Sequence, residues 1–327
     1  MEEAAAAPIE ELDFRAALAD RIAETEIETT QVVACTNCGA EVAFDADIHA
    51  AECPFCASPV VTDTGAHRHF KPRGILPFLL SEREARGHLA RWLEGLWFAP
   101  SGVRDYARAG RALQGVYLPF WTFDADTRSR YSGQRGDTYY VSEWRTVFVN
   151  GKHKRVMQKV PKIRWTRVSG RVARAFDDVL VIATRSLPKR FADRLTAWDL
   201  HGLMPYSESY LAGYRAEAYT VDLEEGYQAA RAIMDIRIRR DVRFDIGGDR
   251  QRIHQVETKT SAETFKHILL PVYLAAYRYR GQSYRFVVNA RTGEVIGERP
   301  YSRWKIGLAT ICILALVALF VLFAMTQ

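Results

Sequence analysis

The chain has 327 residues, of which 48% are hydrophobic and 26% are charged. This composition excludes an intrinsically disordered chain and is typical of one large globular domain or two ordinary ones. The net charge of +6 is uneven, since residues 1–30 carry −7 and the remainder carries +13. A basic body favours an anionic neighbour such as lipid headgroups, nucleic acid or an acidic protein, and basic side chains that merely solvate the surface explain it equally well.

The first segment, residues 1–30, is acidic and is expected to be helical. Ile9, Leu12, Leu18 and Ile22 form a weak apolar stripe at helical spacing. The segment lacks the apolar core of a signal peptide, so nothing in it indicates secretion. We therefore expect the cysteines to stay reduced.

Four cysteines follow within residues 31–62, as two Cys-x-x-Cys pairs separated by fourteen residues: Cys35, Cys38, Cys53 and Cys56. Two such pairs can place four thiolates about 2.3 Å from one zinc ion in a tetrahedron. Disulfides and a redox pair are weaker alternatives in a reducing compartment. The spacing predicts a zinc ribbon whose Zn²⁺ is structural, because four thiolates leave no open coordination position.

Residues 69–300 are expected to form a cytoplasmic α+β body. A helix should begin at Ser81, because Glu84 completes a capping box with it. A second long helix is predicted over residues 222–240. Residues 143–156 read as a hairpin turned at Asn150-Gly151, the strongest short hairpin signal.

Residues 152–174 are rich in Lys and Arg and contain no acid. The candidates for contact with an anionic surface are Lys152, Lys154, Arg155, Lys159, Lys162, Arg164 and Arg167. Their alternation with apolar residues fits a strand with one basic face. Such a face could bind lipid headgroups or phosphates, or it could simply be solvated, and the second reading is slightly favoured.

Two segments have similar contexts, residues 118–121 (LPFW) and 270–273 (LPVY), and each leads into an aromatic-rich strand. This hint of duplication suggests two β-α-β lobes, with chance similarity as the rival explanation. The fold class expected from the sequence is therefore α+β, with a zinc ribbon, a β-rich body and one C-terminal transmembrane helix.

Residues 306–325 form an uncharged run of twenty residues that would extend roughly 30 Å as a helix, the thickness of a bilayer core. Arg299, Arg303 and Lys305 precede the run, beside Trp304. Because positive flanks stay on the cytoplasmic side, the sequence predicts a tail-anchored, single-pass protein of the inner (cytoplasmic) membrane with its body in the cytoplasm.

Motifs of common enzymes are missing from the chain. It contains no Gly-x-x-x-x-Gly-Lys-Ser/Thr loop, no His-Glu-x-x-His and no Gly-x-Ser-x-Gly. The sequence thus favours a protein that is not an enzyme, although a site assembled from residues distant in sequence stays an alternative.

Several segments together resemble a family: the CTNC and CPFC pairs, GILPF (74–78), LPFWTFDA (118–125), LLPVYLAAYRYRG (269–281) and VVNARTGEVIGERPYSRWK (287–305). The chain resembles bacterial zinc-ribbon membrane proteins of unassigned function, which are often labelled primosomal protein N-prime or helicase-like. The resemblance implies action beside a flotillin-like membrane scaffold. A helicase would need a phosphate cradle, which this sequence lacks.

These observations lead to two functional hypotheses. The first is a non-enzymatic, membrane-tethered zinc-ribbon adaptor that recruits a cytoplasmic or membrane protein. The alternative is a nucleic-acid-binding protein held at the membrane, which the basic stretch and the ribbon suggest.

Overall fold

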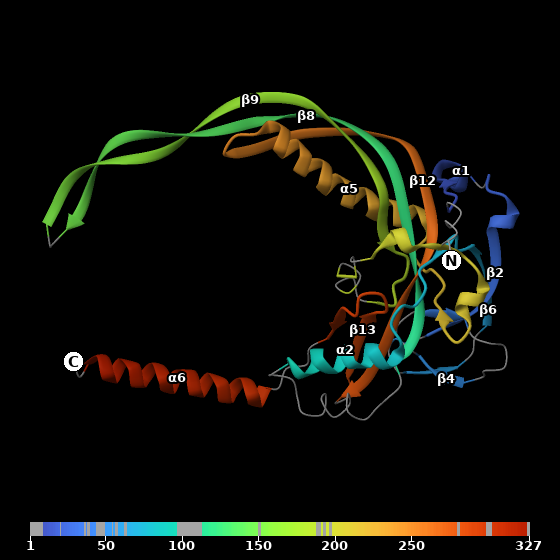
Figure 1. Ribbon diagram of the computed structural model, residues 1–327. Coiled ribbons are helices and arrows are strands. Elements are labelled where there is room, and N and C mark those ends of the chain that lie inside the picture. Colours follow the sequence, from blue (N-terminus) through green and yellow to red (C-terminus); the bar gives the residue numbers. More distant parts are fainter. Residues whose placement is uncertain are drawn as a thin grey trace, which may run out of the picture.

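The computed structural model describes residues 9–19, 21–35, 37, 40–43, 50–53, 55, 58–61, 64–96, 113–149, 152–187, 191, 194–195, 198–279, 282–298 and 303–325. Three long strands dominate these residues: β8 (Gln114–Val149), β9 (Lys152–Ile182) and β12 (Arg250–Tyr279). Strand β8 lies between the other two and is antiparallel to both. Figure 1 shows the three strands curving together around one side of helix α5.

The curvature has a local cause where the three strands lie side by side. The register shifts between Phe123 and Ala125 in β8 and between Ser261 and Thr264 in β12. Beside these shifts, Asp178 has φ 51° and Ala262 has φ 52°. Bulges bend a strand and increase its twist, and these bulges lie at one level, so the strands bend together.

Helix α5 (Leu223–Ile246) covers the concave face of this bend (Figure 1). It begins at Asp222, whose side chain accepts a hydrogen bond from the backbone of Glu225, and it ends at Gly247 with φ 65°. Its buried residues recur at helical spacing and share one cluster with Trp121 and Phe265. The helix predicted over residues 222–240 is therefore confirmed.

The opposite end of the sheet carries α2 (Glu82–Glu94), β13 (Gln282–Asn289) and β14 (Val295–Gly297). Helix α2 begins with the predicted capping box of Ser81 and Glu84. It packs its apolar side on β13 and β14. Short strands complete the sheet: β1 (Leu12–Asp13), β7 (Gly74–Ile75), β10 (Met204–Pro205) and β11 (Arg215–Ala216).

The N-terminal part forms two small sheets beside the large one. One contains β2 (Ile27–Ala34), β3 (Glu41–Ala43) and β6 (Thr64–Phe70), and the other contains β4 (Ala50–Glu52) and β5 (Pro59–Val61). Four further short elements are α1 (Phe14–Leu18), η1 (Glu24–Glu26) and, between β9 and α5, η2 (Leu200–Gly202) and η3 (Glu208–Leu211). The small sheets share a core with the large one, because Cys35, Cys53 and Phe55 are buried in the same cluster as Leu118 and Ile268.

The prediction of an α+β body with two β-α-β lobes is wrong. The structure is one large, mostly antiparallel sheet, and the two segments read as a duplication are neighbours within it. Leu118 lies directly opposite Leu270, and Tyr117 lies opposite Pro271. The two segments look alike because they contribute to the same core from adjacent strands.

The prediction of a transmembrane helix is also corrected. Residues 306–325 belong to α6 (Arg303–Met325), yet among the described residues no helix is both long enough and apolar enough to cross a membrane. The membrane as an integral partner, the tail-anchored topology and the inner-membrane location were inferred from that helix and are not retained.

Candidate functional site

The long hairpin of β8 and β9 continues past the end of β12. Strand β12 begins at Arg250, opposite Gly136 of β8, so residues 137–149 pair only with residues 152–164. We call this two-stranded ribbon the arm. Figure 1 shows it projecting far beyond α5. The pairing of Val149 with Lys152 confirms the predicted hairpin, whose turn residues lie outside the described part of the chain.

The predicted basic residues all lie on β9. Lys152, Lys154, Arg155, Lys159, Lys162 and Arg164 belong to the arm, and Arg167 follows it, opposite Gln134. Successive residues of a strand point to opposite faces, so the even-numbered members lie on one face and Arg155, Lys159 and Arg167 on the other. The structure thus gathers the basic residues on one strand and divides them between its two faces.

One face of the arm exposes large apolar side chains. Tyr140, Trp144, Phe148 and Met157 share this face by their register, and they are 65%, 59%, 67% and 55% exposed. We call it the apolar face. The rings of Phe148 and His153 lie 5.1 Å apart, and the guanidinium of Arg155 lies 5.9 Å from the Trp144 ring. A sequence reading of the hairpin finds these apolar positions, but it does not reveal that they face solvent.

The other face of the arm is charged. Lys162 forms an ion pair with Glu143, which raises the pKa of the lysine and lowers that of the carboxyl. The guanidinium of Arg164 lies 5.2 Å from the centre of the Tyr139 ring. Both interactions are at the surface, where an ion pair contributes little stability. This face is a solvated one, so the exposed aromatic rings of the apolar face are the feature that requires an explanation.

The edges of the arm are also open. Among the described strands, none pairs with the outer edge of β9 or with residues 137–149 of β8 from the other side. An open edge presents backbone N–H and C=O groups that can add a strand from another chain. The arm therefore offers a partner both side chains and main-chain hydrogen bonds.

Two of the four predicted zinc ligands fall within the described residues. Cys35 and Cys53 are buried, and their backbone N–H groups donate to the carbonyls of Ala40 and Ser58, both at 2.8 Å. The two cysteines thus begin equivalent turns, as two Cys-x-x-Cys pairs would. The described residues contain no group of cysteines that converges on a metal, so the description of the chain as zinc-binding is not supported there. Cys38 and Cys56 lie outside these residues, so the four-cysteine site stays a prediction.

A cluster of acids lies where the three strands bend. Oxygen atoms of Glu11, Asp124 and Asp177 all lie within 4.8 Å of one another, a spacing that could suit a metal ion. However, the ammonium of Lys266 lies 2.7 Å from Glu11 and 2.9 Å from Asp178. A lysine held among carboxylates supplies the positive charge that a metal would bring, so we interpret this cluster as structural.

The pKa values of the acid cluster reflect that arrangement. Burial, followed by a hydrogen bond with Glu11, raises the pKa of Asp124 to about 7. Burial also acts to raise the pKa of Glu11, but hydrogen bonds with Asp124, Lys266 and Thr264 outweigh it and lower the value to about 2. One carboxyl of the pair therefore keeps its proton near neutral pH while the other stays ionised.

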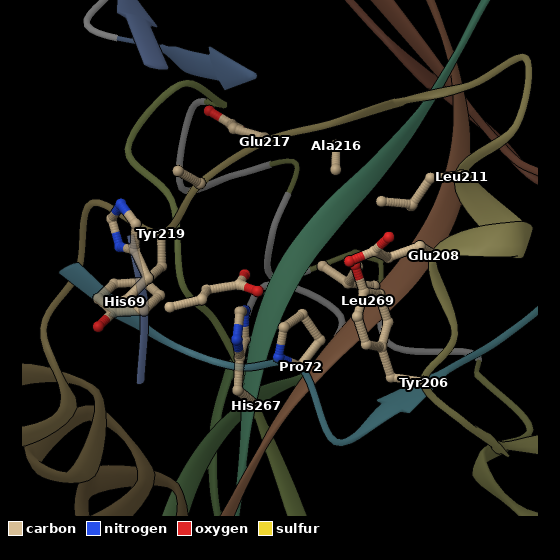
Figure 2. A pocket seen from close by; sticks show the side chains of 12 residues that line it. His69, Pro72, Tyr206, Glu208, Leu211, Ala216, Glu217, Tyr219, His267 and Leu269 are labelled. Carbon is tan, nitrogen blue, oxygen red and sulfur yellow. The ribbon is translucent and has the colours of Figure 1, made fainter. Parts of the chain in front are cut away.

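A pocket of about 310 Å³ opens between the N-terminal sheet and the large sheet. Figure 2 shows His69 and Tyr219 on one side of it, Tyr206 and Glu208 on the other, and His267 between them. These residues come from β6, β12, η3 and the segments after β10 and β11, so no local sequence pattern could bring them together.

Burial alters the acid–base behaviour of two pocket residues. It lowers the pKa of His267 to about 4, so the ring is neutral at pH 7. It raises the pKa of Glu217 to about 8, although the hydroxyls of Thr184 and Ser186 donate to the two carboxyl oxygens at 2.7 and 3.0 Å. Groups with strongly shifted pKa values in a cavity are candidates for ligand binding.

Comparison with known proteins identifies a similar protein, but that protein has no assigned activity. The chain is 25% identical over 241 residues to the uncharacterized protein YdjG of Bacillus subtilis (strain 168). The alignment covers 73% of this chain and 66% of the relative. No protein-family model matches the chain, and no solved structure matches it either. The resemblance to zinc-ribbon proteins therefore remains an expectation from the sequence, and the arm and the pocket are the features from which a function must be argued.

Proposed function

We propose that this protein is a non-enzymatic adaptor that recruits a protein partner through its arm. The observation that carries the proposal is the apolar face, where Tyr140, Trp144, Phe148 and Met157 are exposed and no core formed by the described residues lies beside them. Contiguous exposed apolar side chains of this size mark interaction surfaces. Aromatic residues and Met are also the types enriched at protein–protein interfaces.

Burial of this face against a partner would contribute a substantial part of a binding free energy. Burying a large apolar side chain is worth about 1.5–3 kcal/mol. Trp144 and Phe148 are each about 60% exposed or more, so their burial contributes roughly 1–2 kcal/mol apiece. Contributions of that size are typical of the residues that dominate an interface. The open edges of the arm can add main-chain hydrogen bonds to the same partner.

Charge indicates what kind of surface the partner has. Arg155 and Lys159 lie on the apolar face beside its aromatic rings, and Lys154 and Arg164 lie on the opposite face. A partner with an acidic rim around an apolar groove would complement this arrangement. Complementary charge speeds association and disfavours partners of the wrong sign.

Nucleic acid is the second candidate partner. Arg155 lies over Trp144, and Arg164 lies over Tyr139, so two exposed rings already stack with cations. Aromatic rings in a basic groove bind single strands by stacking on the bases while Lys and Arg contact phosphates. Binding of this kind falls steeply as salt increases. We rank it second because Trp144 and Tyr139 lie on opposite faces of the arm, and Met157, directly opposite Trp144, offers phosphates nothing.

The test compares two variants of the full chain. Trp144→Ala/Phe148→Ala removes the centre of the apolar face, and Phe244→Ala removes a side chain on α5, outside the arm, that is 90% exposed. Affinity purification is carried out with and without nuclease, and bound proteins are quantified. We expect acidic proteins that bind the wild type and Phe244→Ala, resist nuclease, and are reduced at least tenfold with the double variant.

Two results would decide against the proposal. If the double variant retains the same proteins as Phe244→Ala, the arm does not recruit them. If nuclease removes everything that depends on Trp144 and Phe148, the second candidate replaces the first.

A further inference from the structure

The geometry points to a ligand site, separate from the arm, in the pocket between the N-terminal sheet and the large sheet: we propose that it binds a small organic cation, a primary ammonium group on a short apolar chain. At about 310 Å³ the pocket is within the size range of small-molecule sites. The arm and its partner play no part in this inference.

The charge of the lining selects for a cation. Glu28 and Glu208 contribute carboxyl groups, whereas the carboxyl of Glu217 is occupied by Thr184 and Ser186. No Lys or Arg is among the described residues that line the pocket. Burial raises the pKa of Glu28, which shows that its carboxylate is partly withdrawn from water. A cation in the pocket would restore the stabilisation that the carboxylates lose by burial.

His267 supplies an independent observation that points to a ligand. The residue is 5% exposed and lines the pocket, and Figure 2 shows its ring rising from β12 toward the other labelled side chains. Its Nδ1 lies 2.8 Å from the carbonyl oxygen of Phe70. A carbonyl only accepts, so the ring proton is on Nδ1 and Nε2 presents a lone pair.

That lone pair has no partner among the described residues. Nε2 of His267 is buried and makes no hydrogen bond to them. An unsatisfied buried acceptor costs about 1–3 kcal/mol, so a ligand that supplies a donor would be stabilised here. Since the ring is neutral at pH 7, it would not repel a cation. An ammonium group provides N–H donors and positive charge together, which neither an alcohol nor a metal ion does.

The rest of the wall suits an apolar chain. Pro72, Leu211 and Leu269 line the pocket, and Tyr206 and Tyr219 add aromatic rings. The Tyr219 ring lies 5.4 Å from the His267 ring, edge to face. Aromatic faces attract cations, and apolar side chains favour burial of methylene groups. The ligand class is therefore an alkylammonium rather than a bare inorganic cation.

Isothermal titration of the full chain with n-hexylammonium tests the inference, with n-hexanol as the uncharged analogue. We expect saturable binding of the amine, and binding of the alcohol at least roughly tenfold weaker. His267→Phe keeps a planar ring and removes Nε2. A hydrogen bond to a charged group is worth about 1.5–3 kcal/mol, so this variant should bind roughly ten to a hundred times more weakly. The control His201→Phe, at a fully exposed side chain, should bind as the wild type does.

A measurement on the unmodified protein avoids any effect of the substitution on folding. The ¹⁵N signals of the His267 ring should shift on adding n-hexylammonium, and the Nε2 signal should move most because that atom gains a hydrogen bond. Absence of saturable amine binding, equal binding of the alcohol, or an unchanged Nε2 signal at saturation would each overturn the inference.

Discussion

The Glu263→Gln substitution is predicted to destabilise the protein in a pH-dependent way. Glu263 is buried on β12, where its carboxylate accepts hydrogen bonds from Arg15 at 2.6 Å, Tyr227 at 2.7 Å and Thr260 at 2.6 Å. Through these contacts it ties α1 and α5 to the bend of the sheet. Glutamine keeps the shape of the side chain and removes its charge.

The size of the expected loss of stability follows from the pKa of the Glu263 carboxyl. Burial acts to raise it, but the hydrogen bonds from Arg15, Thr260 and Tyr227 outweigh burial and lower the pKa of Glu263 from 4.5 to about 2. Because the pKa of Glu263 is lower in the folded protein than in the unfolded chain, the ionised carboxyl stabilises the fold. This stabilisation is fully present above the pKa of the unfolded chain, and it is lost as the pH falls through the pKa of the folded protein. At about 1.4 kcal/mol per pKa unit, the carboxylate contributes roughly 3 kcal/mol at pH 7.

Urea unfolding, followed by tryptophan fluorescence to which the buried Trp121 contributes, measures this contribution. We expect Glu263→Gln to lower the free energy of unfolding by about 2–3 kcal/mol at pH 7 and by less than half of that at pH 3. Glu257→Gln changes an exposed carboxyl on the same strand and should change stability by less than about 0.5 kcal/mol. A loss of equal size at both pH values, or one below about 1 kcal/mol at pH 7, would refute the reasoning.

Three further predictions concern the core, the acid cluster and the cysteines. Gly226→Ala should cost about 1–3 kcal/mol, measured as a lower urea midpoint, because the added Cβ would lie 2.7 Å from Trp121. Lys266→Met should cost about 3–5 kcal/mol at pH 7, because it leaves the surrounding carboxylates without their partner, and a melting temperature within 2 °C of the wild type would contradict this. If the four-cysteine site exists, mass spectrometry of metals should find about one zinc ion per chain, and Cys35→Ser should lose it.

Local patterns in the sequence predicted local structure well. The capping box at Ser81, the hairpin about Asn150-Gly151 and the helix after Asp222 all depend on residues a few positions apart, and all three are confirmed. Each signal reflects an interaction within one element, so the rest of the chain cannot override it easily.

Long-range pairing could not be predicted in the same way. Residues 250–265 contain few apolar side chains, so no local pattern predicts the first half of β12. That extension depends on pairing with β8, and the one-sheet fold follows from it. The same limit applies to the pocket, where His69 and His267 meet although almost two hundred residues separate them in the sequence.

The apolar face shows a related limit. Alternation identifies which residues of the arm share a face, but whether that face is buried depends on what packs against it. Nothing in the described part of the chain covers Trp144 and Phe148. The basic residues were identified from the sequence, whereas the exposed aromatic row beside them required the structure.

Site-specific photocrosslinking from the arm tests the proposed function most directly. Phe148 is replaced by p-benzoylphenylalanine in the full chain, and the same replacement at the exposed Phe244 serves as the control. The adaptor account predicts a nuclease-resistant protein adduct from position 148, and none of the same mass from position 244. No adduct from position 148, or one that nuclease degrades, would contradict the claim that the arm recruits a protein.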